Sequence, residues 1–497
     1  MKSFKSKLGI AITIIIAGLA TQAQAQFIFT TNSGAITITS YTGADRDITI
    51  PSTLNGLPVT RIGTAAFWQN FSLLNVTIPD SVTNIGYLAF NHCIALTNVT
   101  LSQNLRTISD EAFGYCESLR DIAIPDAVTY IGSKAFDSCY KLASITISSN
   151  VANILDNAFI SCLNLPAITV DALNPYYASV DGVLFDKSVG TLMQCPGGKM
   201  GSYSIPLSVR RILTRAFWSC EKLTSLTIPG SVTNIGQQAF LGCSRLTTIT
   251  IPSSVTSIGQ NAFGNCDAMT DITVDPINPS YCSVNGVLFD KSINILLQCP
   301  AGKTGTYNIP NGATAIGSYA FSRCFGLTGV TIPNSVHSIS NGAFYVCIYL
   351  TTVTVPGSVR SIDAGAFASC RYLQGVYFMG NAPAAAESTF TSSFPTIYYL
   401  PGTSGWGPTF AGRPTALWLL ANPIILAYNA SIGGQRDEFG FTVSWATNAS
   451  VVIEACTNMA NPIWQSLQTR ALSNGVAYFS DSQRTNFPVR FYRVRSP

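Results

Sequence analysis

Residues 231–253 read SVTNIGQQAFLGCSRLTTITIPS, and residues 254–274 repeat them almost position for position as SVTSIGQNAFGNCDAMTDITV. An Ala-Phe pair marks each copy of this unit along the chain. Its phenylalanine recurs at Phe67, Phe90, Phe113, Phe136, Phe159, Phe217, Phe240, Phe263, Phe321, Phe344 and Phe367. The usual step is 23 residues, but it is 58 from Phe159 to Phe217 and from Phe263 to Phe321. The residues that lengthen these two steps are themselves duplicated, because the segments from Asn174 and Asn278 match at a distance of 104 residues.

A fixed period of this length is typical of a solenoid, in which each unit buries its apolar side chains against its neighbours. Ordering one unit costs roughly 35 kcal/mol at about 1.5 kcal/mol per residue, which the few apolar side chains of a single unit cannot offset. The units are therefore expected to stack as coils.

The alternation around Ile249 and Ile251 predicts a strand in each coil, with the isoleucines in the core and Thr250 facing outward. Gly259 then allows a tight corner. Residues 260–266 are expected to form one helical turn that places the phenylalanine and the cysteine on the core. Each coil is thus predicted to contain a strand, a corner and a short helix.

The repeated pattern is Ile-Gly-x-x-Ala-Phe-x-x-Cys-x-x-Leu-x-x-Ile-x-Ile-Pro-x-x-Val. It resembles the leucine-rich repeats of the BspA type and extends over about residues 48–399. The resemblance implies a leucine-rich-repeat solenoid, found in secreted and surface proteins, that binds other macromolecules. Common leucine-rich repeats place Asn or Cys just after the strand, whereas here proline follows the strand and cysteine precedes the leucine.

We therefore predict an α/β, strand-rich leucine-rich-repeat solenoid with two β-hairpin inserts, followed by a small all-β, sandwich-like C-terminal domain. The expected domains are a signal peptide (1–25), an N-terminal cap (26–60), the solenoid (61–400, with inserts at about 171–206 and 275–310), a closing segment (401–420) and the C-terminal domain (421–497). In that last domain, strands are predicted at 439–445, 451–457, 464–472, 477–480 and 489–494.

The first residues indicate export. Three lysines, Lys2, Lys5 and Lys7, precede the apolar run 8–20, and Ala23-Gln24-Ala25 is a small-residue cleavage site. Without those lysines, 25 Lys+Arg remain against 24 Asp+Glu, and charged residues make up only 10% of the chain. A nearly neutral chain lacks the excess of positive charge that is typical of proteins that bind nucleic acid or an anionic membrane. We expect a protein that is extracellular or at the cell surface, with no transmembrane segment after signal removal.

The chain has 14 cysteines, and ten of them lie three residues after the repeated phenylalanine. Side chains stacked in register lie about 4.7 to 4.9 Å apart, whereas a disulfide requires converging Cβ atoms near 3.8 Å. We therefore expect a ladder of buried thiols that act as small hydrophobic groups. Asn70 takes this place in the first coil, and the pairing of Cys282 and Cys456 is left open.

The inserts carry turn signals of their own. Asp181-Gly182 and Asn285-Gly286 lie between apolar residues and predict type I′ hairpins. Second turns are expected at residues 186–188 and 290–292. Each insert is thus predicted to be a small antiparallel sheet, which acts either as a spacer or as a recognition element.

No catalytic or metal-binding constellation emerges from the sequence. His92 and His337 are the only histidines and occupy unrelated coil positions, which leaves little for a metal site or a Ser-His triad. The Gly302-Lys303-Thr304 triplet lacks the first glycine of a phosphate-binding loop. We therefore expect no catalytic residue, no cofactor and no metal.

The outward position of the strand is the remaining candidate site. It is occupied by Thr77, Thr100, Thr146, Thr169, Thr227, Thr250, Thr273, Thr331 and Thr354, with Ala123 as an interruption and Tyr377 at the end. Threonine suits a half-buried pleated surface, so the column has a purely structural explanation. It also forms an uncharged hydroxyl face to which a protein or polysaccharide could bind.

Three functions are compatible with these observations. An exported, non-enzymatic binding or adhesion protein that recognises a protein or polysaccharide fits best. A structural surface protein that self-associates is the first alternative. A hydrolase with its activity in the C-terminal domain is the second, although that segment has no histidine and its carboxylates are scattered.

Overall fold

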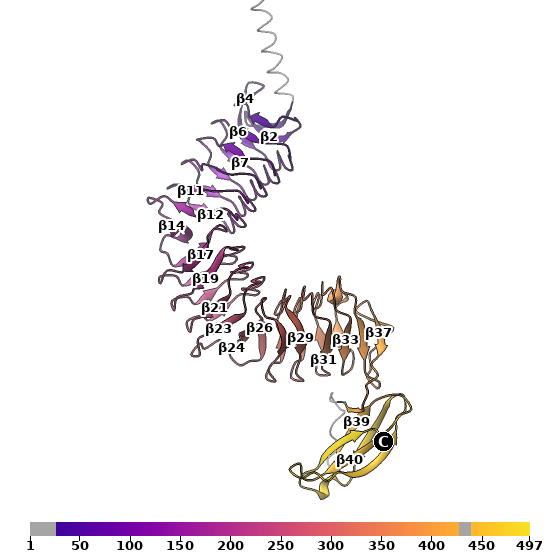
Figure 1. Ribbon diagram of the computed structural model, residues 1–497. Helices are drawn as coiled ribbons and strands as arrows, with labels where there is room; N and C mark the ends of the chain where they lie inside the picture. Colours follow the sequence, from indigo (N-terminus) through magenta and orange to yellow (C-terminus); the bar gives the residue numbers. More distant parts are fainter. Residues whose placement is uncertain (1–25, 427–438) are drawn as a thin grey trace, which may run out of the picture. The chain divides into compact units, whose positions relative to one another are not determined.

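The computed structural model describes residues 26–426 and 439–497, so the predicted signal peptide lies outside the described residues. The chain divides into two compact units, Met1–Cys266 and Asp267–Pro497. Figure 1 shows stacked coils in both units. No helix within the described ranges has the length and apolar character needed to span a bilayer.

Most coils contribute one strand to a first ladder, in which buried and exposed residues alternate. In β8 (Asn98–Thr100), for example, Val99 is buried between two exposed residues. The other strands at this position in the first unit are β3 (Asp47–Thr49), β6 (Asn75–Thr77), β11 (Ile145–Ile147), β13 (Ile168–Val170), β17 (Gly201–Ser204), β19 (Leu223–Thr227) and β21 (Thr248–Ile251). Those of the second unit are β23 (Asp271–Val274), β27 (Gly305–Asn308), β29 (Leu327–Thr331), β31 (Thr352–Val355), β33 (Gly375–Phe378), β35 (Thr396–Tyr399) and β37 (Arg413–Leu417), with β36 (Thr409–Phe410) antiparallel to β37.

A second ladder of very short parallel strands was not predicted from the sequence. The strands of the first unit are β5 (Leu57–Ile62), β7 (Asn84–Ile85), β9 (Thr107–Ile108), β10 (Tyr130–Ile131) and β12 (Asn153–Ile154), followed by β16 (Thr191–Gln194), β18 (Arg211–Ile212), β20 (Asn234–Ile235) and β22 (Ser257–Ile258). The second unit contributes β26 (Ile295–Gln298), β28 (Ala315–Ile316), β30 (Ser338–Ile339), β32 (Ser361–Ile362) and β34 (Ala384–Ala385). Most of these strands have only two residues, which are too few to produce a recognisable period in the sequence. They pair only because the coils stack.

The predicted helical turn at residues 260–266 is wrong, because consecutive turns take its place. Asn261 and Asn265 have left-handed φ values of 54° and 56°. The equivalent segment around Phe113 shows why. Glu111 and Phe113 donate their N–H groups to the next coil (2.9 and 2.8 Å), while Ala112 and Gly114 donate to the residue three positions earlier (3.2 and 3.0 Å). Every second N–H thus serves the neighbouring coil, which a helix does not allow. Among the residues that the structure describes, the helical elements are two 3-10 turns, η1 (Glu387–Phe390) and η2 (Arg484–Asn486).

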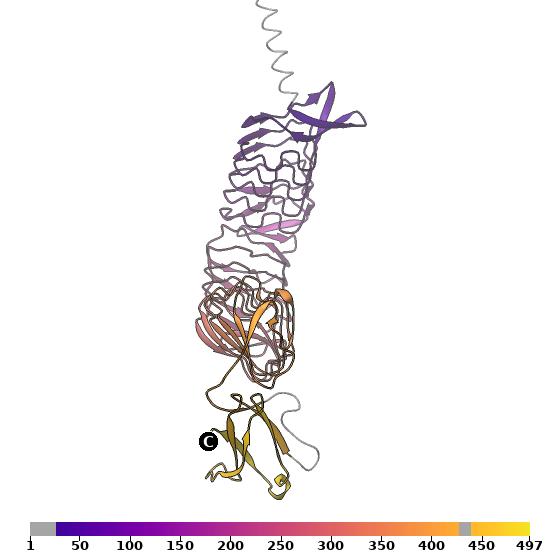
Figure 2. The ribbon, with the colours of Figure 1, turned by 90° about the vertical axis from the view of Figure 1, so that its right-hand side faces the viewer.

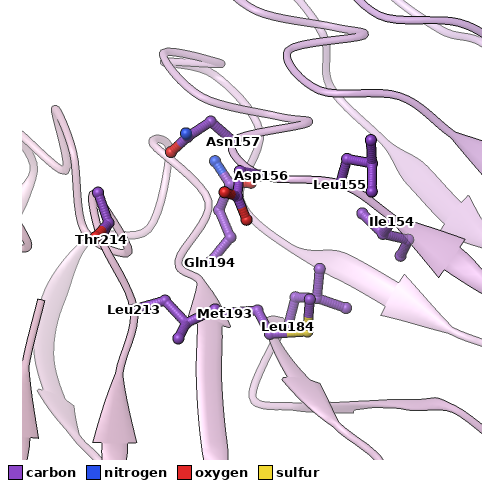
Figure 3. Close-up of a pocket in the computed structure, with 9 residues that line it drawn as sticks. All are labelled: Ile154, Leu155, Asp156, Asn157, Leu184, Met193, Gln194, Leu213 and Thr214. Carbon is purple, nitrogen blue, oxygen red and sulfur yellow. The ribbon is translucent and has the colours of Figure 1, made fainter.

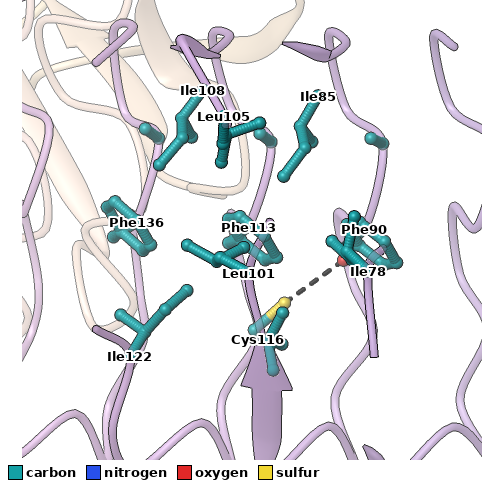
Figure 4. Close-up of a cluster of buried hydrophobic side chains, with 14 of the residues drawn as sticks. Ile78, Ile85, Phe90, Leu101, Leu105, Ile108, Phe113, Cys116, Ile122 and Phe136 are labelled. Atoms are coloured by element: carbon teal, nitrogen blue, oxygen red, sulfur yellow. Dashed lines mark hydrogen bonds between the residues drawn. The ribbon is translucent and has the colours of Figure 1, made fainter. Parts of the chain in front are cut away.

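The repeated phenylalanines form buried columns of stacked rings, which the inserts separate. The Phe90 and Phe113 rings stack with centroids 5.2 Å apart, and the Phe113 and Phe136 rings with centroids 5.5 Å apart. Figure 4 shows these three rings side by side among isoleucines and leucines. In the second unit, Phe321, Phe344, Phe367 and Phe390 stack in the same way. The core of each unit is therefore a set of in-register side-chain columns.

The cysteine ladder consists of free, buried thiols, as the coil spacing predicts. Each thiol also makes a hydrogen bond that was not predicted. Cys116 Sγ donates to the carbonyl oxygen of Phe90 at 3.2 Å, drawn as a dashed line in Figure 4. Ser393 occupies the place of the cysteine in the coil of η1, and its hydroxyl donates to the Phe367 carbonyl at 2.7 Å. The ladder therefore ties each coil to the preceding one.

Replacing Cys93, Cys116 and Cys139 by serine is expected to reduce the loss of stability at alkaline pH. Burial raises the pKa of Cys93 to about 12 and places those of Cys116 and Cys139 well above their usual range. The folded state therefore keeps protons that the unfolded chain releases above about pH 8.5. Stability falls as pH rises from there through the folded pKa. Urea midpoints between pH 8 and pH 10.5 should fall more steeply for the parent protein than for the variant, and parallel slopes would contradict the assignment.

Each insert is an antiparallel sheet, as predicted. In the first insert, β14 (Tyr177–Val180) pairs with β15 (Val183–Asp186), which pairs with β16. In the second, β24 (Tyr281–Val284) and β25 (Val287–Asp290) repeat this arrangement with β26. The turn residues Asp181 and Gly182 have φ values of 50° and 77°, as a type I′ turn requires. Lys199 Nζ donates to the Asp181 carbonyl at 2.5 Å, and Lys303 Nζ to the Asn285 carbonyl at 2.7 Å, so these lysines fix the hairpin turns.

The first unit begins with β1 (Phe27–Asn32) and β2 (Ala35–Tyr41), an antiparallel pair that forms the end of the stack in Figure 2. The short strand β4 (Thr53–Leu54) pairs with β5. The Tyr41 ring stacks on Phe67 at a centroid distance of 5.5 Å. Tyr41 therefore covers Phe67, the first ring of the phenylalanine column.

The C-terminal segment is all β, as predicted. β38 (Ile424–Ile425), β39 (Phe439–Ser444) and β42 (Val476–Asp481) form one sheet, and β41 (Gln465–Ala471), β40 (Ser450–Cys456) and β43 (Phe491–Arg495) form another. Phe441, Val443, Ile453 and Phe479 belong to the core they share.

The arginines near the end of this segment have acidic partners. Arg493 and Arg495 bind Glu454 at 2.7 and 3.0 Å, and their hydrogen bonds and charges hold the pKa of that carboxyl below its usual range. Arg490 lies 2.7 Å from Asp481.

The solenoid with hairpin inserts and a small all-β C-terminal domain is confirmed as the fold.

Candidate functional site

The predicted threonine column lies on the outward side of the first ladder. All nine threonines are exposed, and Tyr377 is half-buried. Within the first unit, Thr77 is in register with Thr100, and Thr146 with Thr169. The backbone therefore brings the side chains of neighbouring coils into one row in each unit.

The hydroxyls of one pair in the row are hydrogen-bonded to each other, and one of them also bonds to a strand. Thr146 Oγ1 and Thr169 Oγ1 are 2.7 Å apart, and Thr169 Oγ1 is 2.8 Å from the Ile145 carbonyl oxygen. Such cross-strand pairs contribute roughly 0.2–1 kcal/mol each. The row therefore has a structural role, and its exposure leaves it accessible to a partner.

Three members of the row were missed by the sequence analysis. Thr49 is in register with Thr77, Ser204 with Thr227, and Asn308 with Thr331. The signal was present, because each of the three precedes an Ile-Pro pair in the same way as the threonines of regular coils. Serine and asparagine hid the equivalence at positions 204 and 308, and Thr49 lies in the segment that was predicted to be the N-terminal cap.

A second polar column lies two residues before the first on the same strands. Asp47 is in register with Asn75, which is in register with Asn98, and isolated bridges extend the column to Asp121 and Ser144. Asn75 donates to the Asp47 carboxylate, and Ser144 Oγ donates to Asp121 Oδ1 at 3.2 Å. The outward side of the first unit is therefore lined by hydroxyl, amide and carboxylate groups. We call these two columns the strand face.

In the second unit the strand face ends in aromatic rings. The Tyr377 and Tyr398 rings stack at 4.8 Å, and the Trp418 ring lies 5.0 Å from Tyr377. The main-chain N–H of Trp418 donates a hydrogen bond to the main-chain carbonyl of Tyr399 at 2.7 Å. Tyr377 is thus partly covered by its neighbours.

A separate cavity of about 140 Å³ opens beside the first insert (Figure 3). Its lining comes from the coil of β12, from the insert strands β15 and β16, and from the corner after β18. The lining residues are Ile154, Leu155, Asp156, Asn157, Leu184, Met193, Gln194, Leu213 and Thr214. This cavity could not be predicted from the sequence, because it results from the way the insert interrupts the stack.

The other residues considered as chemical groups have structural contacts. The His92 ring stacks on Tyr115 at 4.3 Å, and His92 Nδ1 lies 2.5 Å from Asn91 Oδ1. Within residues 26–426 and 439–497, no cluster of three or more His, Cys, Asp or Glu side chains could hold a metal ion. Burial raises the pKa values of Cys116 and Cys347 well above the usual range, which keeps these ladder cysteines as unreactive thiols.

Comparisons with known proteins agree with this architecture. A family model described as BspA type leucine rich repeat region (6 copies) matches residues 46–176, 196–295 and 301–401. No curated protein matches the sequence.

Among solved structures, the chain is similar to a leucine-rich repeat protein from Eubacterium ventriosum, with 27% identity and a TM-score of 0.51, over 68% of this chain and 91% of that chain. A leucine rich cell surface protein from Faecalibacterium prausnitzii matches with 28% identity and a TM-score of 0.40, over 77% of this chain and 94% of that chain. The family model covers more than half of the sequence, and the stacked coils carry its repeats. The chain therefore belongs to the BspA-type leucine-rich-repeat family.

Proposed function

We propose that this chain is an exported, non-enzymatic binding protein that recognises a macromolecular partner through the strand face. The observation that carries the proposal is the row of exposed threonines, held in register by the coils and extended by Thr49, Ser204 and Asn308. Family membership and the predicted signal peptide support a location at the cell surface or in the medium. The domain division predicted from the sequence is part of the proposal, with recognition assigned to the solenoid.

A protein partner is favoured over a polysaccharide. Charged side chains are depleted at the centre of protein interfaces, and threonine supplies the row with an uncharged surface. Ser and Asn, which also occur on the strand face, provide adaptable hydrogen bonds at recognition surfaces. In a regular ladder, each further coil adds the same groups at a fixed spacing, which suits a partner with an extended surface.

Replacing Thr77, Thr100 and Thr146 by lysine is expected to weaken partner binding by at least about tenfold, because three desolvated positive charges oppose docking. The parent chain, residues 26–497, would first be tested against secreted proteins, envelope fractions and purified polysaccharides. The variant would then be compared by surface plasmon resonance on the ligand that the parent binds.

The control variant carries the same three lysines at Thr129, Thr256 and Ser257, which are exposed residues beside or within the second ladder. This control should bind as the parent does. Equal binding by parent and strand-face variant would move recognition away from the first unit's strand face. Binding to no fraction would favour the structural, self-associating alternative. Selective binding to a polysaccharide that the strand-face variant loses would replace the protein partner.

A further inference from the structure

The first insert interrupts the second ladder of the first unit. β12 pairs with β10 on one side, and its sheet ends there. β16 pairs with β15 and β18 and belongs to a different sheet. The cavity of about 140 Å³ occupies the place at this interruption where neighbouring coils would otherwise bond to each other.

The interruption leaves main-chain groups of the cavity lining without their usual partners. In preceding coils, the Ile108 carbonyl accepts from Gly132 at 2.8 Å and the Ile131 carbonyl accepts from Leu155 at 2.9 Å. The next carbonyl of this series, that of Ile154, accepts a hydrogen bond from none of the residues that the structure describes. The N–H of Asn157 is likewise unpaired among them, although its counterpart in the preceding coil, Lys134, donates to Asp156 at 3.2 Å. One acceptor and one donor therefore remain for a ligand or for water.

Gln194 adds a buried amide to these groups. Gln194 is only 6% exposed. Its Oε1 accepts a hydrogen bond from the Phe159 N–H at 3.2 Å. In regular coils, a main-chain carbonyl of the next coil accepts this hydrogen bond. Gln194 Nε2 donates to none of the described residues. This donor is therefore left for a ligand or a water in the cavity, which Gln194 lines. Figure 3 shows Gln194 and Asp156 together among the residues that line the cavity.

The apolar lining also departs from the repeat. The corner residue of the other regular coils in the first unit is Gly or Ser, as at Gly86, Ser109, Gly132, Gly236 and Gly259. At the cavity the same position is Leu155 before the insert and Leu213 after it. Two leucines thus line the cavity at positions where a regular coil has at most a serine side chain.

We propose that this cavity binds one pyranose residue at the end of a glycan chain. A cavity of about 150 Å³ holds one benzene molecule. A pyranose with its hydroxyls is larger than benzene, so 140 Å³ takes one face of a single sugar ring while its remaining hydroxyls lie at the opening. Sugar hydroxyls both donate and accept hydrogen bonds. The cavity offers two acceptors, the Ile154 carbonyl and the Asp156 carboxylate. It also offers two donors, the Asn157 N–H and Gln194 Nε2. Leu155, Leu213 and Met193 would contact the C–H groups of the ring. Asp156 and Thr214 are exposed, so the rest of the glycan can extend into solvent.

The test uses the full chain, residues 26–497, with the methyl glycosides of common hexoses and N-acetylhexosamines as probes. Saturation-transfer NMR would identify the glycosides that bind, and calorimetry would give their affinities. At least one glycoside should bind. Asp156→Asn should weaken it at least about tenfold, because the mutation removes a charged acceptor. Asp156 is exposed, so this substitution does not threaten folding.

Leu155→Gly should weaken the same glycoside several-fold, because it removes an apolar wall. Ser109→Gly is the matched control, since Ser109 takes the same coil position away from the cavity, and it should bind as the parent does. No binding by any glycoside, or equal binding by parent and both cavity variants, would overturn the proposal. The strand-face lysine variant should retain glycoside binding, so this inference and the proposed function can fail separately.

Discussion

Phe240→Ala is expected to lower the free energy of unfolding by about 3–5 kcal/mol, the usual cost of removing a buried phenylalanine ring. Phe240 has no exposed surface, and its ring stacks between Phe217 at 4.9 Å and Phe263 at 5.4 Å. The loss affects two coil interfaces at once. Urea unfolding followed by circular dichroism should show a lower midpoint for the transition that includes this coil.

Phe71→Ala is the matched control for this prediction. The Phe71 side chain is 55% exposed, so its removal should change the free energy of unfolding by no more than about 0.5 kcal/mol. An unchanged midpoint for Phe240→Ala, or equal effects of the two substitutions, would contradict the stacked-column core.

Gly259→Ala is expected to cost about 3 kcal/mol, the upper end of the usual range for overpacking. A Cβ atom at this corner would lie 2.2 Å from the main-chain nitrogen of Gln237 in the preceding coil. The main chain of Gln237 cannot move aside in the way that the end of a flexible side chain can. The two coils must therefore separate to make room for the added methyl group. Thermal unfolding and urea midpoints should both fall.

Gly230→Ala offers the comparison. No atom lies within 4 Å of the Cβ position at Gly230, and its φ is not left-handed. The substitution should be neutral or stabilise by up to about 1 kcal/mol, because alanine restricts the unfolded chain. Equal destabilisation by both alanines would show that contact with the preceding coil is not the cause of the effect at Gly259.

Features that repeat with the coil could be predicted from the sequence. The 23-residue step placed Phe113 and Cys116 in buried columns, because a residue that recurs at a fixed coil position has the same neighbours each time. The Asp-Gly and Asn-Gly pairs predicted the insert hairpins because a type I′ turn requires positive φ at both residues. The strands of the C-terminal domain followed from local alternation of apolar and polar residues.

Features that depend on contacts between coils could not be predicted in this way. Ala262, Phe263 and Cys266 have a spacing that is compatible with one helical turn, and only the bonds to neighbouring coils replace that helix by turns. Ile85 and Ile108 pair in strands of two residues, too short to leave a pattern. The cavity at Gln194 exists because the insert removes a pairing that both flanking coils would otherwise make. Sequence gives the identity of its lining residues but not the interruption that brings them together.

The thiol-to-carbonyl bonds have a consequence for how such a chain can change in length. Cys116 bonds to Phe90, and Cys139 bonds to Phe113 at 3.3 Å, each across the same 26 positions. An insertion or deletion of one whole 23-residue unit therefore joins surfaces that already fit each other. A change of another length within a coil shifts its columns out of register, unless the extra residues form a hairpin of their own, as those of the two inserts do. The array can thus be made longer or shorter in steps, by duplication or loss of coils, while the groups on its outward side are altered independently.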